Sequence, residues 1–205
     1  GDLEQEGKST WTCDSTSQWI WRGEEKEFQY LIDEWKREGI YEDIEQGIIH
    51  IIWTGGEPTL PKHQETINNF YDYWFDVQED GLDENYDWNP YTEIETNGTV
   101  YINDNLFNTL DQINCSPKLS NSGMTEKQRI KPEAINRIME HSNYQFKFVV
   151  SNEDDIKEMF NDFIIPFNIP LQRVVCMPGM DKQEQFHERT QWILEMAKKY
   201  RFIGL

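Results

Sequence analysis

Small, polar and turn-forming residues recur along the chain in short groups, each placed directly after an apolar run. The groups are Thr54-Gly55-Gly56-Glu57-Pro58, Glu95-Thr96-Asn97-Gly98-Thr99, Ser116-Pro117-Lys118, Ser151-Asn152 and Pro178-Gly179. In the first group, Gly55-Gly56 lets the backbone come close to a ligand and leaves peptide N–H and C=O groups for it, while Glu57 can hold an ammonium group. The pattern therefore indicates ligand binding at the ends of the apolar runs.

Each group also has an ordinary structural explanation when it is taken singly. Gly55-Gly56-Glu57-Pro58 could be a tight turn that leads into a helix at Pro61. Asn97-Gly98 is a common turn sequence, and a single lysine such as Lys118 is most often a solvated surface residue. The functional interpretation depends on the groups occurring together.

The elements that would position these groups alternate between strands and helices. Short β-branched or alternating runs predict strands at 48–53, 91–96, 112–115, 146–150 and 173–177, and helical spacing predicts helices at 28–39, from Pro61, at 106–110, from Pro132, at 152–160 and at 181–200. The run at 48–53 is apolar on both faces, as in a buried parallel strand. Repeated strand–helix units favour an α/β fold with a parallel sheet or barrel covered by helices, and a site at the carboxyl ends of the strands.

Composition excludes several classes of protein. The chain has 205 residues, of which 37% are hydrophobic and 14% aromatic, and its formal net charge is −19. The apolar content is sufficient for a buried core, and the negative charge disfavours binding to nucleic acid and to anionic membranes. The sequence contains no apolar run of membrane-spanning length. We expect a cytoplasmic protein with one domain over residues 1–205, containing an acidic loop or insertion near 78–90. The start at Gly1 and a strand-like ending at 200–204 suggest that the barrel is truncated at both ends.

Three cysteines are too few and too far apart for a disulfide-stapled scaffold. Cys115 lies one residue before Ser116 in a strand, so it should face the opposite side and belong to the core. Cys176 lies in an apolar strand and is also expected to be buried. The histidines lack metal-ligand spacing, and His187 is expected on an exposed helix face.

In combination, these motifs resemble the 7-carboxy-7-deazaguanine synthases of the radical S-adenosylmethionine superfamily. The Gly-Gly-Glu group at 54–58, the groups at 95–99 and 116–118, the strand Lys147-Phe148-Val149-Val150, Met177-Pro178-Gly179 and the segment Cys13-Asp14-Ser15 carry the resemblance. They follow the family's order over residues 13 to about 200. The resemblance implies an incomplete, open parallel β/α barrel of the radical S-adenosylmethionine type.

The resemblance also implies a reaction. Enzymes of this family convert 6-carboxy-tetrahydropterin to 7-carboxy-7-deazaguanine with loss of ammonia, a step toward queuosine and related deazapurines. A 4Fe-4S cluster reductively cleaves S-adenosylmethionine, and the resulting radical takes a hydrogen from the substrate. The implied partners are the pterin, an electron donor such as flavodoxin or ferredoxin, and a second copy of the chain in a homodimer.

Roles follow from the resemblance residue by residue. Cys13 would be a thiolate ligand of the cluster, Ser15 would offer its hydroxyl to a magnesium ion, and Thr54 would bind the substrate. The cofactor would be bound at its methionine end by Gly55, Gly56 and Glu57, at its ribose by Glu95 and Asn97, and along its length by Ser116, Pro117 and Lys118, with Lys118 meeting its carboxylate.

The chain departs from the family at the cluster. Three closely spaced cysteines are needed, and only Cys13 is present in the N-terminal part, with Thr10 three residues before it. The family's upstream Gln-Gly-Glu and arginine contacts, and its terminal Arg and His motif, are also absent. Two alternatives follow: the other ligands belong to sequence before Gly1, which we favour, or this copy binds no cluster. A related radical activating enzyme and a cluster-free binding or regulatory homologue therefore stay open.

Overall fold

The computed structural model describes residues 24–79, 88–179 and 186–204, and within them six strands form one parallel sheet. The strands pair in the order of the sequence, β1-β2-β3-β4-β5-β6, so the order never reverses as it does in a doubly wound sheet. They are β1 (Ile51–Trp53), β2 (Thr92–Thr96), β3 (Gln112–Cys115), β4 (Tyr144–Val150), β5 (Val174–Pro178) and β6 (Ile203–Gly204). The sheet is not closed, which confirms the predicted open β/α barrel.

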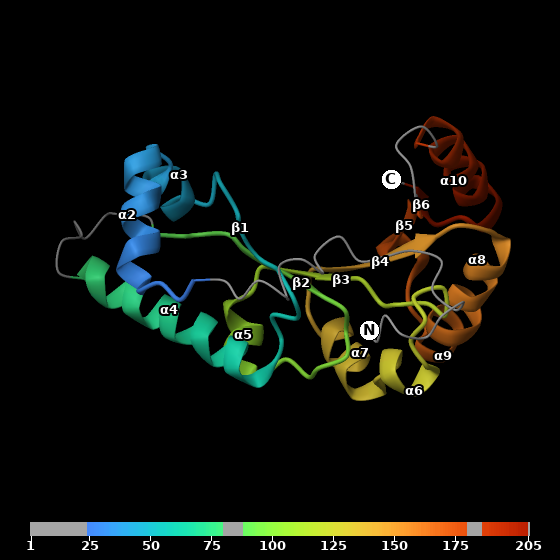
Figure 1. The fold of residues 1–205 in the computed structure, drawn as a ribbon, viewed down its shortest axis with the longest axis horizontal. Coiled ribbons are helices and arrows are strands. Elements are labelled where there is room, and N and C mark those ends of the chain that lie inside the picture. Colours follow the sequence, from blue (N-terminus) through green and yellow to red (C-terminus); the bar gives the residue numbers. More distant parts are fainter. Residues whose placement is uncertain (1–23, 80–87, 180–185, 205) are drawn as a thin grey trace.

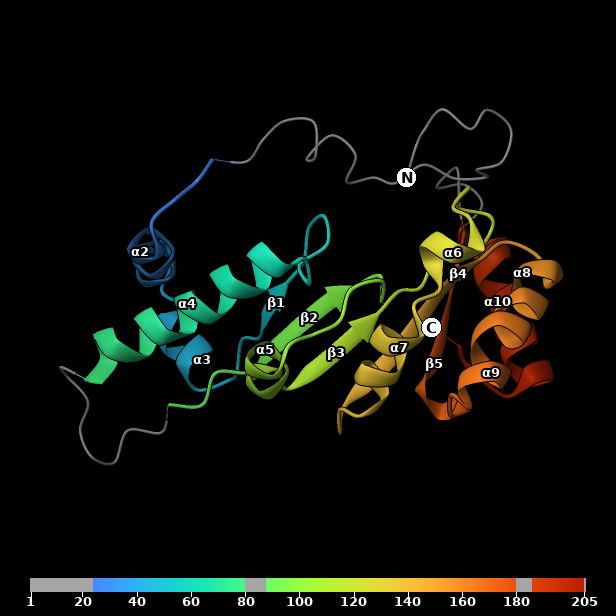
Figure 2. The same cartoon turned by 90° about the horizontal axis from the view of Figure 1, so that it is seen from below.

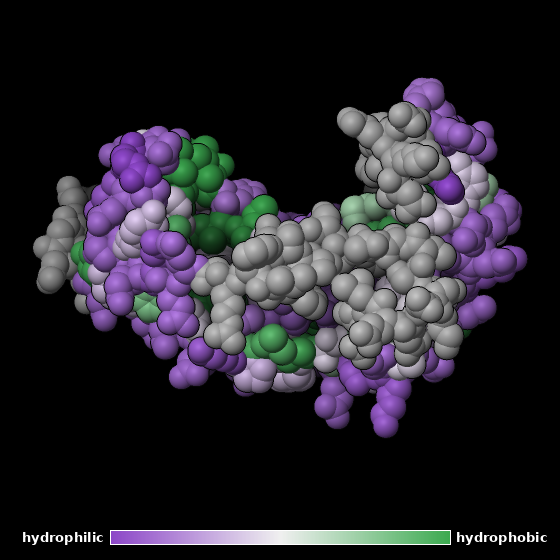
Figure 3. Space-filling view, viewed as in Figure 1, coloured by the Kyte–Doolittle hydropathy of each residue, from purple (hydrophilic) through white to green (hydrophobic). Residues whose placement is uncertain are grey.

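Helices precede β1, connect the strands and cover one face of the sheet. They are α2 (Phe28–Glu38), α3 (Tyr41–Glu45), α4 (Pro61–Glu79), α5 (Asp104–Thr109), α6 (Glu126–Arg129), α7 (Pro132–Met139), α8 (Glu153–Met159), α9 (Ile165–Phe167) and α10 (Phe186–Tyr200). Figure 1 shows α4, α5, α7 and α6 along one side of the sheet, and Figure 2 shows α5 and α7 in front of the strands from that side. The space-filling view shows a broad hollow between the two ends of the molecule (Figure 3). The opposite face of the central strands is therefore turned toward a concave space.

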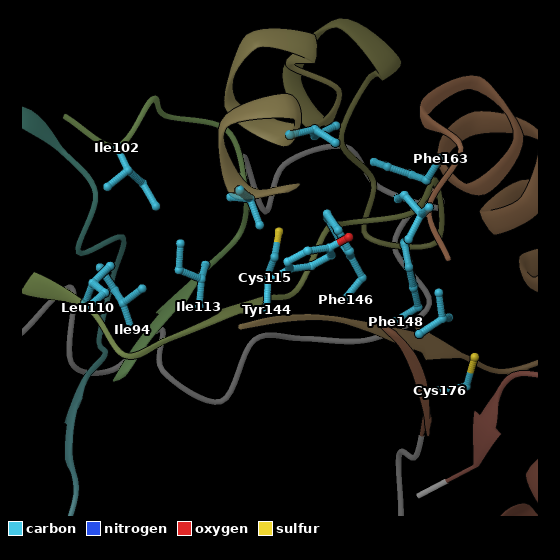
Figure 4. Close-up of a cluster of buried hydrophobic side chains, with 14 of the residues drawn as sticks. Ile94, Ile102, Leu110, Ile113, Cys115, Tyr144, Phe146, Phe148, Phe163 and Cys176 are labelled. Carbon is cyan, nitrogen blue, oxygen red and sulfur yellow. The ribbon is translucent and has the colours of Figure 1, made fainter. Parts of the chain in front are cut away.

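Alternation along the strands decides which side chains enter the core. In β4, Tyr144, Phe146, Phe148 and Val150 are buried, while the residues between them are partly exposed. Figure 4 shows side chains of β2, β3, β4 and β5 gathered on the same side of the sheet. The apolar face thus packs beneath the helices, and the other face keeps polar residues.

The first strand is shorter and less buried than its sequence predicts. The expected strand over 48–53 is β1, which spans only Ile51–Trp53, and residues Ile48 and Ile52 are 66% and 50% exposed. The prediction of burial on both faces was wrong because β1 pairs only with β2 in the described sheet and presents Ile52 to the face that the helices leave uncovered.

The long helix α4 anchors β1 and β2 through aromatic packing. Phe70 and Trp74 are almost fully buried, as the helical spacing predicts. Tyr71 contributes its hydroxyl to a bond of 2.7 Å with Thr92 Oγ1, and burial raises the pKa of Tyr71 to about 12. The helix continues to Glu79, so the predicted loop near 78–90 starts later than expected, and 80–87 lie outside the described residues.

Two further helices differ in extent from the prediction. The helix expected at 152–160 is α8, capped by Asn152, and it continues as the π-helix η1 (Phe160–Ile164) into α9. Pro166 lacks an N–H and would clash with the carbonyl four residues earlier, which explains the wider turn before it. The final helix is described from Phe186, and 181–185 lie outside the described residues. A 3₁₀ turn, η2 (Leu171–Arg173), precedes β5. None of the described helices is long and apolar enough to span a membrane.

Candidate functional site

The parallel pairing of β1, β2 and β3 brings three of the predicted groups to one edge of the sheet. Trp53 pairs with Ile94, and Thr96 pairs with Cys115, so the segments that follow these strands begin side by side. The Ser116 N–H donates to the Thr96 carbonyl oxygen over 2.7 Å, which extends the pairing one residue beyond β3. The groups at 54–58, 95–99 and 116–118 are therefore neighbours, as the sequence predicts.

The Gly55-Gly56 turn has a backbone conformation that favours glycine. Its φ angles are +88° at Gly55 and +60° at Gly56, in the left-handed region. Both glycines are exposed, together with Thr54, and a Cβ added at Gly55 would meet no atom within 4 Å. The requirement for glycine at Gly55 thus comes from the turn itself, and the peptide groups of this turn are open to a ligand.

Glu57, for which the sequence predicts contact with the cofactor, is buried and bonded to protein groups. Its side chain is turned inward, with the residue only 8% exposed. The carboxylate accepts hydrogen bonds from Thr59 N (3.1 Å) and Thr59 Oγ1 (2.5 Å), and from Thr96 Oγ1 (2.6 Å) and Asn97 N (2.8 Å). Three of these bonds go to Oε1 and one goes to Oε2, so Glu57 joins the segment after β1 to the segment after β2. The motif alone does not show these bonds, because Thr96 and Asn97 are distant from Glu57 in the sequence.

The Asn97-Gly98 turn is packed against the core by Cys115. Asn97 Oδ1 accepts hydrogen bonds from Thr99 N (2.9 Å) and Thr99 Oγ1 (2.5 Å), which closes the turn. Gly98 has φ +72°, and a Cβ there would lie 2.6 Å from Cys115 Sγ. Glycine is required at this position by both the conformation and the space.

Glu95 projects from the face of β2 opposite to Ile94 and Thr96, which are buried. Its side chain is 47% exposed, and its Oε1 lies 3.3 Å from the ammonium Nζ of Lys147 on β4. Glu95 is thus a carboxylate that a ligand in the hollow of the sheet could reach.

The third group places one buried and two accessible residues at the end of β3. Pro117 is buried, while Ser116 and Lys118 are half-buried. Burial raises the pKa of the Cys115 thiol well above its usual value, the charge of Glu57 raises it further, and the charge of Lys118 lowers it. Both charged groups therefore act on the same buried thiol.

Helix α8 holds the neighbouring loops through residues that the sequence reasoning missed. Glu158 accepts from Ser120 N (2.7 Å) and Ser120 Oγ (2.5 Å), and it pairs with the buried Arg129 of α6 (2.9 Å). The buried Asp155 accepts from Asn121 Nδ2 (3.1 Å) and Ser151 N (2.7 Å). The polar run that follows Ser151-Asn152 was the available signal, because acidic residues after a strand can bind the N–H groups of adjacent loops.

The described thiols are core residues rather than metal ligands. Cys115 and Cys176 are both fully buried, as predicted, and burial raises the pKa of Cys176 to about 12. Within the described residues no group of three or more His, Cys, Asp or Glu side chains could hold a metal ion. The exposed position of His187 is confirmed. Cys13 and Ser15 lie outside the described residues, so their predicted roles stay predictions.

The burial of these thiols predicts their reactivity. In the folded protein at pH 8, a disulfide reagent such as dithionitrobenzoate should leave Cys115 and Cys176 unmodified, because the buried thiols stay protonated and out of reach. In urea both should react. Mass spectrometry of the labelled peptides distinguishes them from Cys13, and rapid labelling of either residue in the native state would contradict the structure.

Comparisons with known proteins agree with this arrangement. No family model matches the chain. A curated relative, the 7-carboxy-7-deazaguanine synthase of Pyrobaculum aerophilum, is 34% identical over 110 residues, which cover 54% of this chain and 46% of the relative. The match thus spans less than half of the relative's length. The crystal structure of QueE from Escherichia coli has 16% sequence identity and a TM-score of 0.55, over 96% of this chain and 78% of that one.

The two comparisons bear on different predictions. The relative confirms the predicted sequence resemblance to a 7-carboxy-7-deazaguanine synthase over about half of the chain. The QueE structure supports the fold, an open parallel sheet with helices on its outer face. The chain is therefore similar in sequence to a 7-carboxy-7-deazaguanine synthase and similar in fold to QueE.

Proposed function

We propose that this chain is the core of a radical S-adenosylmethionine lyase that converts 6-carboxy-tetrahydropterin to 7-carboxy-7-deazaguanine with loss of ammonia. The main support is the convergence of three motif groups at one edge of the sheet, joined by the hydrogen bonds of Glu57 to Thr96 and Asn97. The curated relative carries the name of this enzyme, which supports the same reaction.

The chemistry of the edge suits S-adenosylmethionine, which has an amino group, a carboxylate and a ribose. The exposed backbone at Gly55-Gly56 would accept hydrogen bonds from the amino group, and Lys118 would pair with the carboxylate. Glu95 and Asn97 would bind the ribose, and Ser116 and Pro117 would line the site. In this proposal Glu57 holds the Gly55-Gly56 backbone in place instead of meeting the amino group with its own carboxylate.

The cluster and the magnesium ion are assigned by resemblance. When bound, a 4Fe-4S cluster would supply the electron that cleaves the cofactor. The cluster would receive this electron from a donor such as flavodoxin or ferredoxin. Cys13 would be one thiolate ligand, and the buried, protonated Cys115 and Cys176 do not suit this role. The remaining thiolates would have to come from outside this sequence. Ser15 would bind magnesium, and the exposed Thr54 would contact the pterin.

Product analysis tests the proposed reaction. The full-length natural protein would be reconstituted anaerobically with iron and sulfide, supplied with S-adenosylmethionine and a reductant, and incubated with 6-carboxy-tetrahydropterin. We expect 7-carboxy-7-deazaguanine and ammonia by mass spectrometry and an ammonia assay. A cluster that forms and cleaves the cofactor without ring contraction would contradict the substrate assignment. Radical transfer to a glycine-containing peptide would instead identify an activating enzyme.

The assignment of Ser15 predicts a changed magnesium requirement. In Ser15→Ala, the magnesium concentration for half-maximal activity should rise about tenfold, because one hydroxyl ligand is lost. The absorbance of the iron–thiolate cluster, at about 400 nm, should stay the same. Ser17→Ala is a control of the same size in the same segment. An unchanged magnesium titration in Ser15→Ala would remove this residue from the site.

A further inference from the structure

Polar side chains occupy the face of the central strands that the helices leave uncovered. Pairing places Glu95 of β2 beside Asn114 of β3, and Asn114 beside Gln145 of β4. Lys147 follows on the same face of β4, two residues closer to the carboxyl end of the strand. Asn114 is buried and donates to Glu93, whereas Glu95, Gln145 and Lys147 are accessible. Interiors of parallel barrels are usually filled by branched apolar residues, so these accessible polar residues are better suited to contacting a ligand than to forming a core.

The two carboxylates of this face differ in their partners. Glu93 is 13% exposed, and its two oxygens are occupied by His50 Nδ1 (2.8 Å) and Asn114 Nδ2 (2.7 Å). Glu95 is 47% exposed, and Lys147 Nζ lies 3.3 Å from its Oε1. In the described part of the chain, the Oε2 atom of Glu95 bonds to no protein donor. Both carboxylate oxygens of Glu93 therefore bond to side chains of the protein, whereas one oxygen of Glu95 is available to a ligand.

The backbone of Lys147 is fixed by the packing of its neighbours. Its neighbours in β4, Phe146 and Phe148, are fully buried on the other face of the sheet, so the backbone at Lys147 is held by the core. From β4 its side chain passes over β3 to reach Glu95 on β2, and it is only 25% exposed. A half-exposed glutamate on a strand has several accessible rotamers, and an ammonium fixed in this way favours the one that it pairs with.

We infer that Lys147 is a positioning residue for cofactor binding: it holds Glu95 Oε1, so that Oε2 faces the hollow and accepts a hydrogen bond from a ribose hydroxyl. This inference rests on the proposed function, in which Glu95 binds the ribose. It adds to that function a residue that acts through Glu95 rather than on the ligand. It also assigns the ribose selectivity of the site to an ion pair that joins β2 and β4.

The test measures ribose recognition rather than overall affinity. S-adenosylhomocysteine and its 2′-deoxy analogue would be titrated calorimetrically into the full-length protein and into Lys147→Met, which keeps the length of the side chain but removes its charge. We expect affinity for S-adenosylhomocysteine to fall about fivefold in Lys147→Met, with little change for the deoxy analogue, because the loss is confined to one ligand hydrogen bond. Lys147→Arg should restore most of the selectivity.

Two further variants make the test specific. Lys199→Met removes a similar exposed pair, Lys199 with Glu153 at 3.1 Å, on the helical surface, and it should change neither affinity. Glu95→Gln should reduce ribose selectivity, and adding Lys147→Met to it should cause no further loss, because the two residues act on the same hydrogen bond.

The outcomes separate this inference from the proposed function. An equal loss of affinity for both ligands in Lys147→Met would overturn the inference, since Lys147 would then contact the ligand itself or support the fold. Unchanged selectivity would overturn it as well. If the wild-type protein bound neither ligand, the proposed function would fail together with it. Thermal unfolding of each variant within a few degrees of wild type excludes misfolding as the cause.

Discussion

Replacing Glu57 with alanine is expected to lower the free energy of unfolding by about 3 kcal/mol and to weaken cofactor binding at least tenfold. The substitution leaves the hydroxyls of Thr59 and Thr96 and the N–H groups of Thr59 and Asn97 without their acceptor, inside a buried region. Buried donors without partners cost about 1–3 kcal/mol each, and partial rearrangement or water entry reduces their sum. The Gly55-Gly56 turn would lose its connection to the end of β2 at the same time.

Urea unfolding and titration with S-adenosylhomocysteine measure the two effects. Glu57→Gln keeps the shape of the side chain but removes the charge and one acceptor oxygen, so it should fall between wild type and alanine. Glu153→Ala, at a half-exposed glutamate of α8, is the control and should change stability by less than about 0.5 kcal/mol. A Glu57→Ala protein as stable as wild type would show that the buried carboxylate does not join these segments.

Replacing Gly98 with alanine is expected to destabilise the fold by about 2–4 kcal/mol. The added Cβ would lie 2.6 Å from Cys115 Sγ, and the φ of +72° is unfavourable for any residue with a Cβ. Since the Asn97-Gly98 turn follows Glu95 directly, its displacement should also lower cofactor affinity. Chemical unfolding of the purified variant gives the stability change.

The structure supplies a control for each cause of this loss. Gly39 at the end of α2 has nearly the same φ, +71°, but a Cβ there would meet nothing within 4 Å. Gly39→Ala should therefore cost only the conformational strain, about 1 kcal/mol. Adding Cys115→Ala to Gly98→Ala removes the clashing sulfur and should recover part of the loss. If Gly98→Ala lowers the free energy of unfolding as much in the Cys115→Ala protein as in the wild type, close packing against Cys115 is not the cause.

Local sequence patterns were sufficient to predict most of the strands and to predict that the polar groups lie at the carboxyl ends of these strands. The strand predicted at 112–115 is β3, and the strand predicted at 146–150 is the carboxyl-terminal part of β4. Cys115 could be assigned to the core because neighbouring residues in a strand face opposite sides. The predicted groups meet because parallel strands end at the same edge, so no side-chain detail was needed for that prediction.

Long-range contacts explain what the sequence could not predict. An apolar run such as 48–53 does not show whether its strand has neighbours on both sides, and so the exposure of Ile52 was missed. The partners of Glu57 in the second segment, Thr96 and Asn97, are about forty residues away, and the motif alone suggested a carboxylate facing a ligand. The Lys147–Glu95 pair likewise depends on the order of three strands, which periodicity does not determine.

The central claim is that the segments after β1, β2 and β3 form one binding site for S-adenosylmethionine. A crystal structure of the protein with S-adenosylhomocysteine tests it most directly. The account predicts the amino group at the Gly55-Gly56 backbone, the ribose hydroxyls at Glu95 and the carboxylate near Lys118. A ligand bound elsewhere on the molecule, or a ligand at this edge that makes none of these contacts, would contradict the claim.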